Sequence, residues 1–251
     1  MAYSFKEQET EFLFQSFTVF EKTFKEITDA LPYTAENKTS WSPKLVNLFL
    51  DICSTFDSLC RHIIAEGKGD EEEVRIIEDG KNTTKKVKHL DITDFEENFL
   101  RPQNFLDKRV IVYIYYLFPN QCLIKPFENY LEICTGWWKI YNQLKHDRFN
   151  NFQKANLENT MRVLAALFVL LVSYKDQQFT LALLRWKLLE TNLGAELVHP
   201  ARIRTGGKNF WYDSLLFATG DCANGIEDIV QVNPSLASHR LRMFMGRLNP
   251  I

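Results

Sequence analysis

One short segment near the middle of the chain carries residue types suited to acid–base chemistry on a phosphate ester. The segment is Trp137-Trp138-Lys139-Ile140-Tyr141-Asn142-Gln143-Leu144-Lys145-His146-Asp147-Arg148. In a helix, Asn142 and His146 stand four residues apart and share one face. Lys145 and Arg148 then lie on a neighbouring face. An amide, an imidazole and two cations therefore come within reach of one ligand.

Each of these groups has a role in phosphodiester cleavage by an adjacent ribose hydroxyl. The imidazole of His146 transfers a proton near neutral pH, and the amide of Asn142 can orient that imidazole or hold a substrate oxygen. Arg148 and Lys145 can neutralise the phosphate. Such a reaction needs no metal ion and no other cofactor. The sequence therefore predicts a candidate metal-independent endoribonuclease site, or a site for RNA or a nucleotide.

A purely structural role explains the same residues. A histidine on an amphipathic helix commonly lies at the edge of the core with its nitrogens bonded locally. Lys145 and Arg148 can be solvated, or they can interact with the negative end of the helix dipole. Spacing alone does not separate these alternatives, so both stay open.

The bulk composition indicates one globular domain. The chain has 251 residues, of which 45% are hydrophobic and 25% are charged, and this matches an ordinary compact protein spanning residues 1–251. With 30 basic and 32 acidic residues, an RNA partner would have to meet a local basic patch. Five dispersed cysteines favour a reducing compartment.

We expect a cytoplasmic protein without a membrane partner. The amino terminus lacks the basic-then-apolar order of a secretory signal. The longest apolar stretch, Val163 to Val172, is about half the length that a bilayer-spanning helix needs. Metal binding is not expected either, because His62, His89, His199 and His239 are dispersed and form no two-histidine motif.

Helical periodicity dominates the chain. One helix is predicted from Phe5 to Leu31, ended by Pro32. Another is predicted to about Ala65, with Ser40 and Ser42 both available as its cap and Pro43 suited to its first turn. Further helices are predicted over residues 91–100, from Pro126 through Cys134, over 136–148, over 157–172 after the cap Asn156, over 179–189 and over 238–247.

Two regions break this helical pattern. Residues 110–118 are largely β-branched and aromatic and predict a strand that turns at Pro119-Asn120. Residues 66–89 form a surface insertion, in which Val74–Ile77 and Val87–Leu90 flank the turn-prone Asp79-Gly80-Lys81-Asn82. A β-hairpin and a mobile loop are both open for this insertion. The Gly-rich stretch at 205–209 lacks the spacing of a phosphate-binding loop and predicts a turn.

The segment around His146 resembles the carboxy-terminal half of HEPN-like helical domains, many of which occur in prokaryotic defence and toxin–antitoxin systems. The likeness rests on Trp137-Trp138-x-x-Tyr141-Asn142-x-x-Lys145-His146-Asp147-Arg148, then Phe152, Ala155, Asn156, Leu157 and the helical Ala165-Ala166-Leu167-Phe168. It covers residues 42–189 and implies a mainly α helical bundle with a small β element. The insertion 66–89 then projects from this HEPN-like core, and 190–251 form an irregular carboxy-terminal extension that packs on it.

In catalytic members of that family the motif is an arginine, a polar residue, three less fixed residues and a histidine, placed at a homodimer interface. The resemblance assigns the polar residue to Asn142 and the histidine to His146, but the arginine position falls on Tyr141. Tyrosine lacks the permanent charge and the fork of donors of arginine. Either Arg148 or Lys145 takes over that role, or the chain is a non-catalytic HEPN-like binding or scaffolding module.

Overall fold

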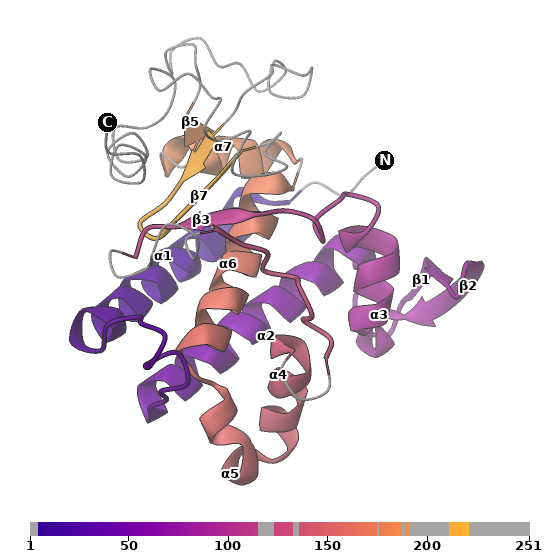
Figure 1. The fold of residues 1–251 in the computed structure, drawn as a ribbon. Coiled ribbons are helices and arrows are strands. Elements are labelled where there is room, and N and C mark those ends of the chain that lie inside the picture. Colours follow the sequence, from indigo (N-terminus) through magenta and orange to yellow (C-terminus); the bar gives the residue numbers. More distant parts are fainter. Residues whose placement is uncertain are drawn as a thin grey trace.

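The structure is a computed structural model that describes residues 5–114, 123–132, 136–174, 176–186, 189–190 and 211–220 (Figure 1). Within these ranges the protein is mainly α, with a hairpin and a small sheet beside the helices. The predicted mainly α class is therefore confirmed. The predicted turn at Pro119-Asn120, the stretch 205–209 and the helix 238–247 lie outside the described residues.

Two long helices begin and end where the sequence predicts. Helix α1 (Glu7–Ala30) stops before Pro32. Helix α2 (Pro43–Ala65) is capped by Ser42, whose Oγ accepts a hydrogen bond from the Leu45 amide at 3.1 Å. Proline suits the first turn of α2, because an N–H group at that position has no acceptor within the helix and its loss costs no hydrogen bond. The two helices pack against each other.

Helix α6 (Leu157–Ser173) lies at the centre of the bundle (Figure 1). Asn156 caps it as predicted, with its Oδ1 accepting from the Asn159 amide at 3.0 Å. Every residue from Val163 to Val172 is buried. Helices α1, α2, α4 (Trp137–His146) and α7 (Gln177–Arg185) contact α6, so it has no solvent-facing side along this stretch.

The insertion is an ordered hairpin. Strands β1 (Glu73–Glu78) and β2 (Lys81–Lys86) pair antiparallel through a two-residue turn in which Asp79 and Gly80 have φ of 51° and 72°. Positive φ at both positions gives the turn that matches strand twist. The expected second strand, Val87–Leu90, was wrong, because residues 87–89 form the 3-10 turn η1 (Val87–His89).

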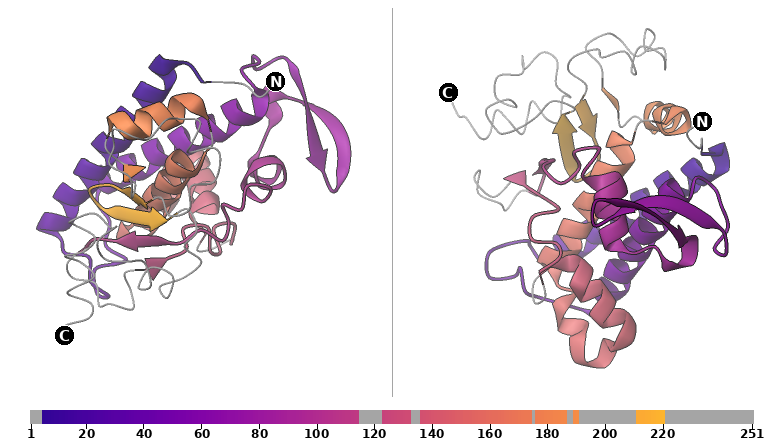
Figure 2. Two further views of the ribbon diagram at one scale, coloured as in Figure 1. Left: turned by 90° about the horizontal axis from the view of Figure 1, so that it is seen from above. Right: turned by 90° about the vertical axis from the view of Figure 1, so that its right-hand side faces the viewer.

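A buried aspartate ties the hairpin to the bundle. Asp94, in α3 (Ile92–Phe95), is 2% exposed and its Oδ2 accepts from the Lys85 Nζ and from the Asp91 amide, each at 2.8 Å. After α3 the helix widens into the π-helical segment η2 (Glu96–Leu100). The hairpin beyond this anchor projects beside α3 (Figures 1 and 2).

The second β component is a five-stranded antiparallel sheet in the order β4-β3-β7-β6-β5. Its strands are β3 (Val110–Val112), β4 (Leu123–Ile124), β5 (Leu189–Glu190), β6 (Trp211–Asp213) and β7 (Phe217–Gly220). The strand predicted over 110–118 is described only to residue 114 and ends at Val112. The expectation of irregular structure after residue 189 was wrong for β6 and β7.

The helix predicted from Pro126 is also wrong, since residues 126–131 form successive turns. Asn129 has φ of 56°, in the left-handed region, which interrupts helical hydrogen bonding. The Glu128 and Glu132 amides instead donate to the carbonyls three residues earlier, at 3.1 and 2.9 Å. Cys134 lies outside the described residues.

No single helix among the described ranges is long and apolar enough to cross a membrane. The two helical segments 148–154 and 157–173 reach that length and composition only when they are taken together, and the chain bends by 82° between them.

A buried carboxylate on α1 holds the turn between β6 and β7. Glu21 is 4% exposed, and its oxygens accept from the Ser214 hydroxyl, from the Leu215 amide at 3.2 Å and from the Leu216 amide at 2.7 Å. Hydrogen bonds from these three donors compensate for the free-energy cost of removing the Glu21 carboxylate from water. The contact links the first helix to the sheet.

We expect Glu21→Ala to lower the free energy of unfolding by about 3 kcal/mol, because it leaves buried donors of the 214–216 turn without their acceptor. Urea denaturation measures the change. Glu26→Ala is the matched control on the same helix: its carboxylate is exposed, so the expected change is within about 0.5 kcal/mol. Equal losses in the two variants would contradict the anchoring role.

Candidate functional site

Aromatic packing fixes the start of α4. The Trp137 indole donates to the Pro126 carbonyl at 2.9 Å, and the Trp137 and Phe56 rings meet edge to face with centroids 5.3 Å apart. Gly136 precedes the helix, where a Cβ atom would lie 2.4 Å from the Tyr130 carbonyl oxygen. Only glycine tolerates this approach, so the direction of α4 is set by its first residues.

The helix predicted over 136–148 is shorter than expected. α4 ends at His146, and Asp147 leaves helical geometry with φ of −147° and ψ of 79°. The Asp147 carboxylate caps a new short helix, α5 (Arg148–Asn151), by accepting from the Asn150 amide at 3.2 Å and the Asn150 side chain at 2.6 Å. Arg148 is therefore not on the same helix as the other candidate residues, and this part of the prediction was wrong.

The structure places three of the four predicted residues on the last turns of α4. Asn142 is half-buried, whereas Lys145 and His146 are exposed, and so is Arg148 at the start of α5. Among the described residues, no hydrogen bond or ion pair joins Asn142, His146 or Arg148 to another side chain. His146 is thus open to solvent and is not covered by the tryptophan pair.

Tyr141, at the family's arginine position, faces the core. Its side chain is 4% exposed and hydrogen-bonds Ser54 of α2. Burial, followed by the nearby charge of Asp57, raises the pKa of Tyr141 to about 12. The Lys145 ammonium lies over the Tyr141 ring, 4.9 Å from its centroid. Position 141 therefore points toward α2.

Cations gather around the junction of α4 and α5. Between Trp137 and Lys154 the sequence has four cations and one acid, a local charge of +3 in a chain of net charge −2. These cations are Lys139, Lys145, Arg148 and Lys154. Within the described ranges none of them forms an ion pair: Lys154 donates to the neutral side chains of Gln143 and Asn151, at 2.8 and 2.7 Å.

Several cations elsewhere among the described residues have acidic partners. Lys85 pairs with Asp94, Lys88 with Glu71 at 2.6 Å, and Arg185 with Glu7 at 2.7 Å. The junction differs from these sites, because none of its four cations forms an ion pair with a carboxylate of the described residues.

Phe149 is the feature that the sequence analysis missed. Its side chain is 88% exposed and directly follows Arg148 in α5. The signal available in the sequence is that Asp147 can stop a helix, which leaves the next apolar residue outside the helical pattern. We call the set Lys139, Asn142, Lys145, His146, Arg148, Phe149 and Lys154 the α4–α5 corner.

Among the described residues, no group of three or more histidine, cysteine, aspartate or glutamate side chains is placed to hold a metal ion. His89 lies in η1. His62 lies on α2, with its Nε2 3.8 Å from a carboxylate oxygen of Glu9. His199 and His239 lie outside the described ranges.

Comparisons with protein-family models, with curated proteins and with solved structures gave no match.

We expect the variant Tyr141→Phe to resist alkaline unfolding better than the wild type. Because burial raises the folded-state pKa to about 12 from an ordinary 10, the neutral phenol stabilises the fold fully below pH 10. That contribution is lost as the pH rises through 12.

The phenylalanine side chain does not ionise, so the variant has no pH-dependent contribution to stability from position 141. Between about pH 9 and 12, the wild-type free energy of unfolding should fall by about 2 kcal/mol more than that of the variant. Denaturant unfolding at several pH values measures the difference, with about pH 8 as the baseline. Parallel pH profiles would show that Tyr141 is not held in a buried setting.

Proposed function

We propose that the α4–α5 corner binds single-stranded RNA or a nucleotide. The observation that carries this proposal is the set of unpaired cations beside the exposed ring of Phe149. Phosphates are attracted to cations that have no acidic partner. Aromatic rings next to such cations bind bases by stacking, whatever the base.

A single strand suits this surface better than a duplex. In an A-form helix the base faces are stacked and cannot reach a protruding side chain. Unstacked bases can lie against Phe149 while neighbouring phosphates meet Arg148 and Lys145. His146 and Asn142 remain available to contact the ribose or the base.

Cleavage is the second candidate function. His146 would act as the acid/base, with Asn142 orienting it, and the solvent-open position of His146 supports this. The inward-facing Tyr141 weighs against it, because no guanidinium can act from that position. The HEPN-like resemblance implies that the cleaving form is a homodimer in which the α4–α5 corners of the two copies face each other around the RNA. Without cleavage, the chain is a binding module.

We expect Phe149→Ala to weaken binding of an oligouridine RNA by about tenfold, because it removes one base-stacking surface. Fluorescence anisotropy with a labelled, unstructured oligonucleotide measures the affinity. Phe12→Ala is the matched control, since Phe12 is also exposed, at 67%, but lies on α1. Equal effects of the two variants would remove the case for stacking at the corner.

The same assay at several salt concentrations tests the cations. Arg148→Ala should lower the slope of log affinity against log salt by about 0.7, the value of one phosphate contact with a single strand. Lys44→Ala is the control, because Lys44 pairs with Glu26 and lies on α2. An unchanged slope for Arg148→Ala would mean that no phosphate meets this guanidinium.

The cleavage candidate predicts RNA fragments with cyclic phosphate ends in the presence of a metal chelator. His146→Ala should reduce that cleavage by about a hundredfold or more while RNA binding changes by about twofold or less. Gel analysis of end-labelled RNA measures cleavage, and anisotropy measures binding. Cleavage that persists in His146→Ala rules out this histidine, whereas binding without any cleavage supports the binding module.

A further inference from the structure

A second exposed aromatic ring lies next to the α4–α5 corner. Trp41, in the segment between α1 and α2, is 41% exposed. Its ring packs against that of Phe152, with the centroids 4.4 Å apart and an angle of 61° between the ring planes. Phe152 is the first residue of η4 (Phe152–Lys154), which directly follows α5. Trp41 therefore lies beside the last residues of the corner, although it stands far earlier in the sequence.

The backbone around Trp41 is held by hydrogen bonds on both sides. One residue before it, the Ser40 carbonyl accepts from the Leu157 amide at the start of α6, at 3.0 Å. One residue after it, Ser42 caps α2. The contact with Phe152, which is itself partly buried against the core, holds the ring. A ring fixed in this way loses little conformational entropy when a ligand binds to it.

Positive charge accompanies the aromatic rings from α5 to η4. Arg148 directly precedes Phe149, and Lys154 follows Phe152 by two residues. The Lys154 ammonium donates to two neutral side chains, at 2.8 and 2.7 Å, so its charge is not balanced by these partners. Phe149 and Phe152 stand three residues apart, a rise of about 4.5 Å along a helix. Rings and cations thus alternate over a short stretch of surface, as in proteins that bind single strands.

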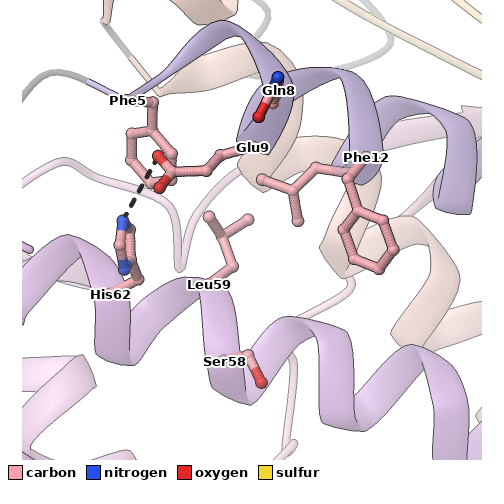
Figure 3. A pocket seen from close by; sticks show the side chains of 8 residues that line it. Phe5, Gln8, Glu9, Phe12, Ser58, Leu59 and His62 are labelled. Carbon is pink, nitrogen blue, oxygen red and sulfur yellow. Dashed lines mark ion pairs between the residues drawn. The ribbon is translucent and has the colours of Figure 1, made fainter. Parts of the chain in front are cut away.

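The exposed ring of Phe12 has different neighbours. It lines a pocket between α1 and α2 together with Glu9 and His62 (Figure 3). Among the described residues that line this pocket there is no lysine or arginine. Its carboxylate, Glu9, already accepts a hydrogen bond from the Lys6 amide at 2.9 Å. A phosphate beside Phe12 would meet a carboxylate, so an exposed ring alone does not indicate a surface for nucleotides.

We propose that the single-strand site extends from Phe149 across Phe152 to Trp41, so that one base stacks on Phe149 and another on Trp41. Lys154 meets a phosphate between the two bases. This extension rests on the proposed function of the α4–α5 corner, and it selects the ligand: an oligonucleotide with at least two unpaired bases. A mononucleotide fills only the Phe149 surface and leaves Trp41 uncovered.

Oligouridines of one to six nucleotides, competing with a labelled strand on the full chain, test the extension. Trp41→Ala should weaken binding of the hexanucleotide by about tenfold, because one stacking surface is lost. The same variant should change mononucleotide binding by about twofold or less. Phe149→Ala should weaken binding of both ligands. A purely structural role of Trp41 would not separate the two lengths.

Tryptophan fluorescence reports on stacking at Trp41 directly, because a base that covers an indole quenches its emission. Trp41 is exposed, whereas Trp137 and Trp138 are 1% and 4% exposed. The hexanucleotide should quench the wild-type emission, and Trp41→Phe should remove most of that quenching. Its affinity should stay within about threefold of the wild type, because phenylalanine keeps a ring on which a base can stack.

Phe12→Ala is the matched control, and we expect it to leave both affinities unchanged. Circular dichroism checks that each variant is folded. Unchanged hexanucleotide binding in a folded Trp41→Ala, together with a loss in Phe149→Ala, rejects the extension and keeps the proposed function. Quenching that survives in Trp41→Phe also places the strand away from this ring. If the wild type binds no oligouridine at millimolar concentration, the proposed function fails and the extension fails with it.

Discussion

The burial of α6 is the constraint on which the rest of the structure depends. From Val163 to Val172 this helix is apolar around its whole circumference, so every side has to be covered by another element. Helices α1, α2, α4 and α7, together with β7, supply that cover. Each covering element turns one face inward and leaves the opposite face to solvent. On these helices the exposed side chains of the described residues, such as Lys145 and His146 of α4, therefore lie on the outer faces.

The α4–α5 corner follows from this arrangement. Aromatic packing and the close approach at Gly136 orient α4 so that Tyr141 and Leu144 face inward. The helical period then places Lys145 and His146 outward. Tyr141 therefore lies on the buried face of α4, although Lys145 and His146 of the same helix are exposed. Because its side chain is buried, Tyr141 cannot take the place of an arginine at the surface. The break at Asp147 adds Arg148 and Phe149 to the exposed set.

Local signals explain what the sequence could predict. Long amphipathic runs and caps located α1, α2 and α6, because proline, serine and asparagine act on their own helix ends. The errors arose where other forces act: Asn129 adopts a left-handed conformation inside a helical pattern. Strands of two to four residues, such as β3 and β7, have too few positions to show a period and pair with partners far along the chain. The pairing of Glu9 with His62 is likewise invisible, because the two lie on different helices.

Helix α2 contacts both α1 and α4, the helix that carries most of the α4–α5 corner. It packs on α1 through the side that carries Leu59 and His62, and on α4 through the side that carries Ser54, the partner of Tyr141. A change in α1 that reaches the α4–α5 corner through α2 requires α2 to move. That helix is buried against α6 along much of its length, and displacing it would open gaps in a close-packed core. The packing thus favours binding at the α4–α5 corner that is independent of the α1 side of the molecule.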